Sequence, residues 1–178
     1  LCITAANACF DEPKQKLMEY CIENLNALVK VAEEENVILL LGTVMGMDSP
    51  CNASTPIVLT VNEVAEIIEQ IGNSYLAAYA DTQVLSIRGE SLTDWFDRLG
   101  EKVRLVRFTD GNYNGYRIWG KGVLPAEKLA EEIYRTGFNG LISFQIPGER
   151  YCENPKDAQK QNHFRALSAW REVMDCQR

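Results

Sequence analysis

Five short apolar runs divide the chain at regular intervals. They are LCITAA (1–6), NVILLLG (36–42), SYLAAYAD (74–81), VRLVRF (103–108) and GLISFQI (140–146). Their length and β-branched content favour strands over helices, although periodicity alone does not separate the two. A segment with helical spacing follows each run, so the pattern predicts five β-α units in succession.

The segments between the runs carry helix start and stop signals. Residues 13–35 place apolar side chains at i, i+3 and i+4, which is typical of an amphipathic helix. Capping residues or a helix-starting proline stand before three later segments: Thr60 with Glu63, Ser91 with Asp94, and Pro125. Gly72 and Gly137 are expected to end two of these helices. The last helix is expected over 157–174, with one face made by Phe164, Leu167, Trp170 and Val173.

Alternating strands and helices indicate a parallel sheet with helices packed outside it. Two architectures fit this pattern, an open doubly wound sheet and a TIM barrel. The open fold usually carries a nucleotide fingerprint, but no GxGxxG follows the first strand, and GTVMG (42–46) lacks the lysine of a P-loop. No linker or low-complexity tract divides the sequence, so we expect residues 1–178 to form a single domain.

Composition and charge exclude several classes of partner. The formal net charge is −7 and no cluster of Lys and Arg appears, which argues against nucleic acid or an anionic membrane surface. The longest apolar run, 37–41, is too short to cross a bilayer. The six cysteines form no CxxC pair, so we expect reduced thiols in a cytoplasmic protein. The chain begins at Leu1 rather than methionine, which suggests a fragment or a processed chain.

Several stretches resemble one known family. VILLLGTV, AAYADTQ, LVRFTDGN and the region 119–156, from WGKG through TGFNG to ERY, are similar to the sugar phosphate isomerase/epimerase family. These are the xylose-isomerase-like TIM barrels, which include tagatose, psicose and fructoselysine 3-epimerases. The resemblance implies an α/β fold, a parallel (β/α) barrel of the TIM type with only about five βα units present. A full barrel usually takes about 250 residues, so we expect upstream residues, a second copy in a homo-oligomer or a partner chain to complete it.

The resemblance also implies a catalytic divalent metal such as Mn²⁺. The family holds it with a Glu, an Asp, a His and a Glu at four successive strand ends, which fall here on Gly42, Asp81, Arg107 and Gln145. Glycine supplies no ligand, arginine is a permanent cation, and glutamine is a poor neutral donor. A substrate-binding histidine of the family falls on Val84. We therefore expect no metal cofactor and no metal ligands in this chain.

Asp81 and Arg107 end neighbouring strands, so we expect their side chains to meet. The guanidinium would then lie near the place that the metal occupies in the family. In one hypothesis they are catalytic, with Asp81 as base and Arg107 as electrophile, and in the other they form a salt bridge without function. The expected substrate-binding residues lie beyond the later strands: Gln145, Tyr113, Trp119, Lys121 and Glu149. Loop aromatics suit sugars but also pack back on a barrel, and Lys121 suits a phosphate near the last two strands.

Two function classes follow. The first is a sugar isomerase or epimerase, which moves a proton next to a carbonyl. The second is a non-catalytic homologue that binds carbohydrate, regulates, or completes another chain, and the replaced metal positions favour it. An endonuclease-like zinc enzyme of the same fold is improbable, because the chain is acidic and its single histidine, His163, lies in a polar helical stretch.

Overall fold

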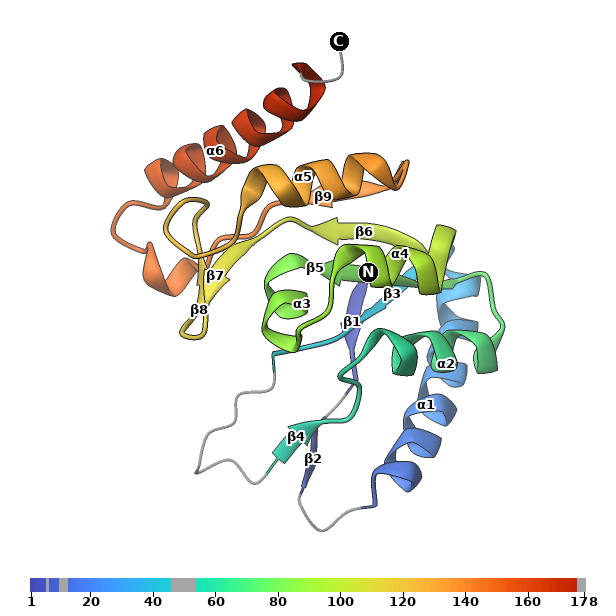
Figure 1. Ribbon diagram of the computed structural model, residues 1–178. Coiled ribbons are helices and arrows are strands. Elements are labelled where there is room, and N and C mark those ends of the chain that lie inside the picture. Colours follow the sequence, from blue (N-terminus) through green and yellow to red (C-terminus); the bar gives the residue numbers. More distant parts are fainter. Residues whose placement is uncertain (6, 10–12, 46–53, 176–178) are drawn as a thin grey trace.

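A parallel five-stranded sheet lies at the centre of the molecule (Figure 1). The structure is a computed structural model that describes residues 1–5, 7–9, 13–45 and 54–175. The strands pair in the order β1 (Cys2–Thr4), β3 (Leu39–Gly42), β5 (Leu76–Asp81), β6 (Val103–Arg107) and β9 (Leu141–Ser143). Because every pair is parallel, the carboxyl ends of the five strands face the same side. We call this side, at Thr4, Gly42, Asp81, Arg107 and Ser143, the carboxyl rim.

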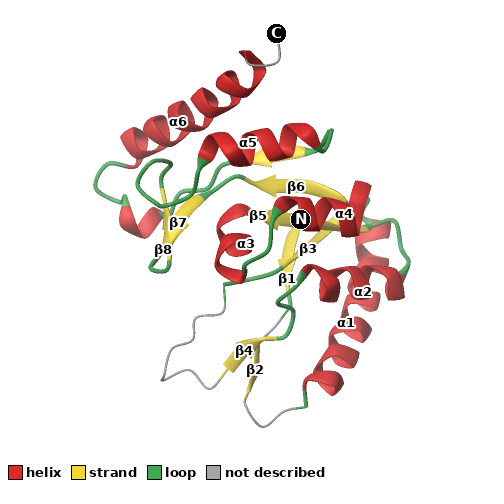
Figure 2. Cartoon of the chain, viewed as in Figure 1, coloured by secondary structure: helices red, strands yellow, loops and turns green. Residues whose placement is uncertain are grey.

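Helices cover one face of this sheet and bury its apolar side chains (Figure 2). They are α1 (Lys14–Glu34), α2 (Val61–Ile71), α3 (Thr82–Arg88), α4 (Leu92–Leu99), α5 (Ala126–Arg135) and α6 (Pro155–Asp175). Alternate strand residues such as Leu41, Ala80 and Val106 face the helices and are completely buried. The opposite face of the sheet carries only a small cluster of Leu40, Ala77 and Tyr79. The sheet is therefore layered like the wall of a barrel. Its main hydrophobic core lies between the strands and the helices that cover them, and the smaller cluster lies on the face that would line the barrel interior.

The expected succession of β-α units is confirmed, including its start and stop signals. Thr60 and Glu63 form the capping box of α2, and Ser91 and Asp94 form that of α4. Gly72 ends α2 in the left-handed conformation with φ of 63°. The sequence did not reveal α3, the antiparallel pair formed by β2 (Asn7–Cys9) and β4 (Ser54–Pro56), or the short hairpin of β7 (Asp110–Asn112) and β8 (Gly115–Arg117). Two short 3₁₀ turns, η1 (Gly100–Lys102) and η2 (Gly148–Arg150), complete the elements.

Helix α6 differs in part from its expected packing. Val173 is buried as expected, but Phe164 is 70% exposed and the buried face is made mainly of small residues. Ala158, Asn162, Ala166 and Ala169 form it, because α6 packs closely on α5. None of the helices in the described ranges is long and apolar enough to span a membrane. Cys2, Cys21 and Cys152 are free thiols, while Cys51, Cys176 and the side chain of Cys9 lie outside what the structure describes.

Candidate functional site at the carboxyl rim

Asp81 lies at the carboxyl end of β5 and is only 3% exposed. Its Oδ1 accepts hydrogen bonds from the backbone N–H groups of Gln83 at 3.1 Å and Val84 at 3.3 Å, so it caps α3. The Thr109 hydroxyl donates to Oδ1 at 2.8 Å, and the Tyr116 hydroxyl donates to Oδ2 at 2.9 Å. Both carboxylate oxygens are thus engaged within the protein, and the side chain joins β5, α3 and the β7–β8 hairpin.

Burial dominates the electrostatics around Asp81. It raises the pKa of the carboxyl above its ordinary value, although the hydrogen bonds from Thr109 and Tyr116 act in the opposite direction. Burial also raises the pKa of the Tyr116 phenol, and the neighbouring Asp81 carboxylate raises it further. Tyr116 therefore stays protonated over the physiological range and remains the donor in its bond to Asp81.

Arg107 does not form the expected ion pair with Asp81. The two residues are register partners on β5 and β6, yet the four ion pairs within the described ranges do not include them. The Arg107 guanidinium carbon instead lies 4.5 Å from the centroid of the Tyr79 ring, a cation–π contact. The hypothesis of a catalytic Asp81–Arg107 pair thus lacks the direct contact on which it rested.

Tyr79 fills the space beside Gly42. The tyrosine is 2% exposed, and a Cβ added at Gly42 would collide with its ring. Burial raises the pKa of the Tyr79 phenol to about 12, the Arg107 charge acts against this rise, and the Asp81 charge adds to it. Gly42, Tyr79 and Arg107 therefore form one packed unit. Gly42 leaves space for the Tyr79 ring, and the ring contacts the Arg107 guanidinium.

These residues do not fit a divalent metal. The position that the resemblance gives to the first glutamate has no side chain, and the space next to it belongs to Tyr79. Asp81 is buried with both oxygens bonded, Arg107 is a cation, and Gln145 is exposed. Within the described ranges, no three His, Cys, Asp or Glu side chains are grouped so that they could hold a metal ion.

A second buried aspartate, Asp110, organises the loop beyond β6. It is 1% exposed, and Oδ2 accepts from the N–H groups of Gly120 and Gly122, each at 2.9 Å. Oδ1 accepts from Gly111 at 2.7 Å and Leu124 at 3.1 Å. Asp110 was not among the residues predicted for the site, because TDGN (109–112) has the composition of a turn. Its signal was an aspartate ahead of a GxG, since glycines let several backbone N–H groups converge on one carboxylate.

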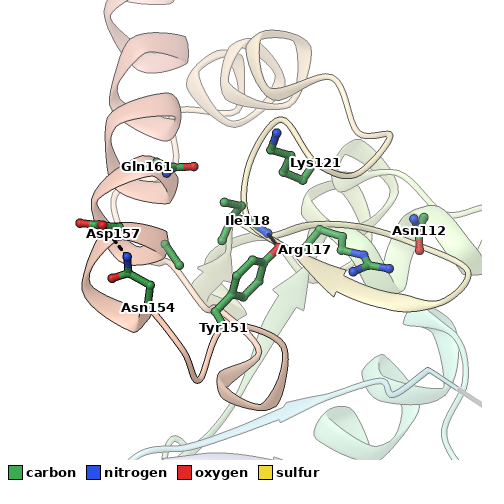
Figure 3. A pocket seen from close by; sticks show the side chains of 9 residues that line it. Asn112, Arg117, Ile118, Lys121, Tyr151, Asn154, Asp157 and Gln161 are labelled. Atoms are coloured by element: carbon green, nitrogen blue, oxygen red, sulfur yellow. Dashed lines mark hydrogen bonds between the residues drawn. The ribbon is translucent and has the colours of Figure 1, made fainter.

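Lys121 stands at the tip of the loop that Asp110 holds. It borders a cleft of about 480 Å³ between the β7–β8 hairpin and the start of α6. The polar residues along the cleft include Asn112, Arg117, Lys121, Tyr151, Asn154 and Gln161. In Figure 3, Arg117 and Lys121 come from the hairpin and its loop, Asn154 and Gln161 from the α6 side, and Tyr151 lies between. Of the expected substrate-binding residues, Lys121 alone lines this cleft.

The other expected substrate-binding residues are dispersed. Trp119 is 4% exposed, packs on Phe108 and donates from Nε1 to the Phe108 carbonyl at 3.1 Å, so its ring belongs to the core. Tyr113 is 89% exposed at the hairpin tip. Gln145 and Glu149 are exposed after β9, and Glu149 lies in η2. His163 is exposed as expected, with its ring edge-on to Phe144.

Comparison with known proteins gives a consistent result. The family described as xylose isomerase-like TIM barrel matches residues 3–170. The chain is 26% identical over 171 residues to fructoselysine 3-epimerase of Escherichia coli O157:H7 and to that of Shigella flexneri, which covers 93% of this chain. It spans 59% of the length of these curated relatives.

Solved structures share the fold at lower identity. A D-tagatose 3-epimerase-like protein superposes with a TM-score of 0.79 at 15% identity, covering 99% of this chain and 64% of that one. The IOLI protein with a binding zinc atom gives 0.75 at 14%, covering 97% and 63%. L-ribulose 3-epimerase gives 0.71 at 13%, covering 93% and 58%. The described strands thus correspond to part of a barrel.

Proposed function

Because the chain belongs to the xylose isomerase-like TIM barrel family, we propose that it binds a sugar or a sugar derivative beside the carboxyl rim. The observation that carries the proposal is the cleft at Lys121. It opens beyond the carboxyl ends of β6 and β9, where TIM barrels place their ligand sites. Its volume of about 480 Å³ is within the range of small-molecule pockets.

The relatives support a carbohydrate ligand. Their names describe epimerases of fructoselysine, tagatose and ribulose, all polyhydroxylated molecules with a carbonyl group. The cleft offers amide side chains from Asn112, Asn154 and Gln161, which can both donate to and accept from hydroxyl groups. Three described cysteines are free thiols, which fits the cytoplasm as the site of action.

A second candidate function is binding without turnover. The packed unit of Gly42, Tyr79 and Arg107 favours it, because that unit occupies the centre where the family's chemistry is expected. Asp81 is also poorly placed to act as a base, since it is buried and both of its oxygens accept hydrogen bonds. On this view the protein recognises a sugar and presents it or senses it.

We further propose that more strands complete the sheet. The edge strands are β1 and β9, and a closed TIM barrel has eight strands. Leu141 on β9 is 69% exposed, and an open edge of this kind would invite pairing with other chains. Further β-α units of the same protein, a second copy or a partner chain would each cover it. Light scattering of the purified protein detects the second copy, because only that arrangement doubles the measured mass.

The test is a titration of ¹⁵N-labelled protein with D-fructose, D-tagatose and D-psicose, followed by NMR. We expect shifts of the amide signals of Lys121, Tyr151 and Gln161. Gln161→Ala should weaken binding about two- to tenfold, the effect of losing one hydrogen bond. Gln70→Ala, at an exposed glutamine of α2, is the matched control and should change nothing. Shifts confined to other surfaces, or no shifts with any sugar, would overturn the proposal.

A deuterium-exchange experiment separates the two candidate functions. Each sugar is incubated with the protein in D₂O, with and without Mn²⁺, and ¹H NMR follows the hydrogen on the carbon next to the carbonyl. Binding without exchange favours the non-catalytic function, and exchange without metal favours an epimerase of altered chemistry. Exchange that requires Mn²⁺ would contradict the argument that this donor set does not hold a metal.

A further inference from the structure

Arg107 places a positive charge on the face of the sheet away from the helices. Its guanidinium contacts the ring of Tyr79, which belongs with Leu40 and Ala77 to the small cluster on that face. Arg107 takes part in none of the four ion pairs that the described residues form. The side chain is half-buried, so water solvates its charge only in part. A cation in this position is available to an anionic ligand.

Tyr79 holds the guanidinium without satisfying its hydrogen-bond donors. The guanidinium carbon lies 4.5 Å from the ring centroid, and the ring face attracts the cation but supplies no oxygen acceptor. Tyr79 is itself fixed, because it is 2% exposed and its ring fills the space beside Gly42. Arg107 is therefore positioned before a ligand arrives, which lowers the entropy lost on binding.

Strand register places neutral hydrogen-bond donors beside Arg107. Ser143 on β9 is its register partner, and register partners on parallel strands present their side chains to the same face. Ile142 packs against the core under the helices, and Phe144 lies edge-on to an aromatic ring of that core. Ser143 and Gln145, which alternate with them, therefore lie on the face of Arg107. Their hydroxyl and amide groups can both donate to an anion.

Asp81 is the acidic group beside this site. It is the register partner of Arg107 on β5, but both of its oxygens accept hydrogen bonds from other protein groups, among them the hydroxyls of Thr109 and Tyr116. Asp81 therefore leaves the guanidinium available. Its negative charge would repel a doubly charged anion more than a singly charged one.

The β7–β8 hairpin connects this site to the cleft at Lys121. Arg117 on β8 lines the cleft, and the adjacent Tyr116 donates to Asp81, the register partner of Arg107. The two regions are thus neighbours, on the two sides of one hairpin strand.

We propose that the carboxyl rim binds the carboxylate of a sugar acid, with Arg107 as its cation and Ser143 and Gln145 as neutral donors. This deepens the proposed function by naming the class of the sugar, and it rests on that function. The fork of a guanidinium matches the two oxygens of a carboxylate. One cation next to a fixed aspartate suits a single negative charge better than the two of a phosphate. The site also lies at strand ends on the carboxyl side, where TIM barrels place their ligands.

Calorimetric titrations with D-fructuronate, D-fructose, D-fructose 6-phosphate and acetate test the proposal at low ionic strength, about 50 mM, where charge contacts are strongest. D-Fructuronate carries a carboxylate where D-fructose has a terminal hydroxymethyl group, so the two sugars differ at the proposed contact. We expect D-fructuronate to bind about tenfold more tightly than D-fructose, the effect of hydrogen bonds to a charged group. D-Fructose 6-phosphate should bind less tightly than D-fructuronate.

Variants of the rim assign the difference to its residues. Arg107→Gln should remove most of it, whereas Arg107→Lys should retain part, because the charge remains but the fork is lost. Ser143→Ala should weaken the binding of D-fructuronate about two- to tenfold and that of D-fructose little, and this variant keeps the test open if Arg107→Gln does not fold. Arg104→Gln, at an exposed arginine of the same strand, is the matched control and should change nothing.

The outcomes separate this proposal from the proposed function. If D-fructuronate and D-fructose bind equally, or Arg104→Gln weakens binding as much as Arg107→Gln, the carboxylate assignment is wrong while sugar binding stands. Tighter binding of D-fructose 6-phosphate that Arg107→Gln abolishes would replace the carboxylate with a phosphate. If acetate binds through Arg107 but no sugar binds, the anion site stands and the proposed sugar function fails. No binding of any probe would overturn both.

Discussion

Two aspartates beyond neighbouring strands of the carboxyl rim are equally buried but held in different ways. Asp81, at the end of β5, is 3% exposed, and Asp110, after β6, is 1% exposed. Each accepts four hydrogen bonds from protein groups. Asp81 receives two of them from side-chain hydroxyls, those of Thr109 and Tyr116. Asp110 receives all four from backbone N–H groups.

The difference teaches what each carboxylate can do. The Asp110 carboxylate accepts hydrogen bonds from four loop N–H groups that have no strand or helix partner. It therefore holds the backbone of the loop that carries Lys121. Asp81 holds side chains that substitutions can change one at a time without disturbing the backbone. We call the loop around Asp110 the fixed part, because backbone groups supply all of its hydrogen bonds, and the surroundings of Asp81 the adjustable part, because side chains supply two of them. The candidate ligand cleft lies beside the fixed part.

The largest expected effect comes from removing the carboxylate of the fixed part. Asp110→Ala leaves four N–H groups without their acceptor, and we expect a loss of about 3–5 kcal/mol in the free energy of unfolding. Urea denaturation followed by circular dichroism measures it. Asp97→Ala, at an exposed aspartate of α4, is the matched control and should change stability by less than about 0.5 kcal/mol. Equal losses in the two variants would contradict the framework role.

A smaller effect is expected from crowding the same carboxylate. Gly122→Ala would place a methyl group against Asp110 and push the loop away, at a cost of about 1–3 kcal/mol. The matched control is Gly148→Ala, because nothing lies within 4 Å of a Cβ added there. Thermal unfolding of both variants measures the difference. If they melt together, the loop is looser than the hydrogen bonds to Asp110 indicate.

The sequence predicted the helices and strands better than the side-chain contacts of the two aspartates. The helices and strands could be predicted because their signals are local. The capping boxes at Thr60 and Ser91 and the apolar strand runs depend only on residues that are close in the sequence. Asp110 was missed because its partners lie up to 14 residues away, at Leu124. The Asp81–Arg107 contact was predicted wrongly, because strand register brings two residues side by side but does not decide that Arg107 prefers the ring of Tyr79.

In the adjustable part, Tyr116→Phe removes one donor from Asp81 and leaves the ring in place. We expect a loss of about 1–2 kcal/mol in the free energy of unfolding, the value of one hydrogen bond to a buried charged group. Tyr113→Phe is the control, because Tyr113 is 89% exposed at the tip of the same hairpin. Chemical denaturation of the two variants decides the matter. No difference between them would show that the hydroxyl bond to Asp81 contributes nothing.

The smallest effect is a pH dependence that also belongs to Asp81. Burial raises the pKa of this carboxyl in the folded state, so folding favours its protonated form. Its contribution to stability is then fully present below the unfolded pKa, about 3.9, and is lost as the pH rises through the higher folded value. Asp81→Asn removes this titration. We therefore expect the stability of the wild type minus that of Asp81→Asn to fall as the pH rises from about 3 to 7. Asp97→Asn, exposed on α4, should give a flat difference. A difference for Asp81→Asn that rises with pH would mean that the four donors outweigh burial, which would make Asp81 a permanently ionised carboxylate like a salt-bridged one.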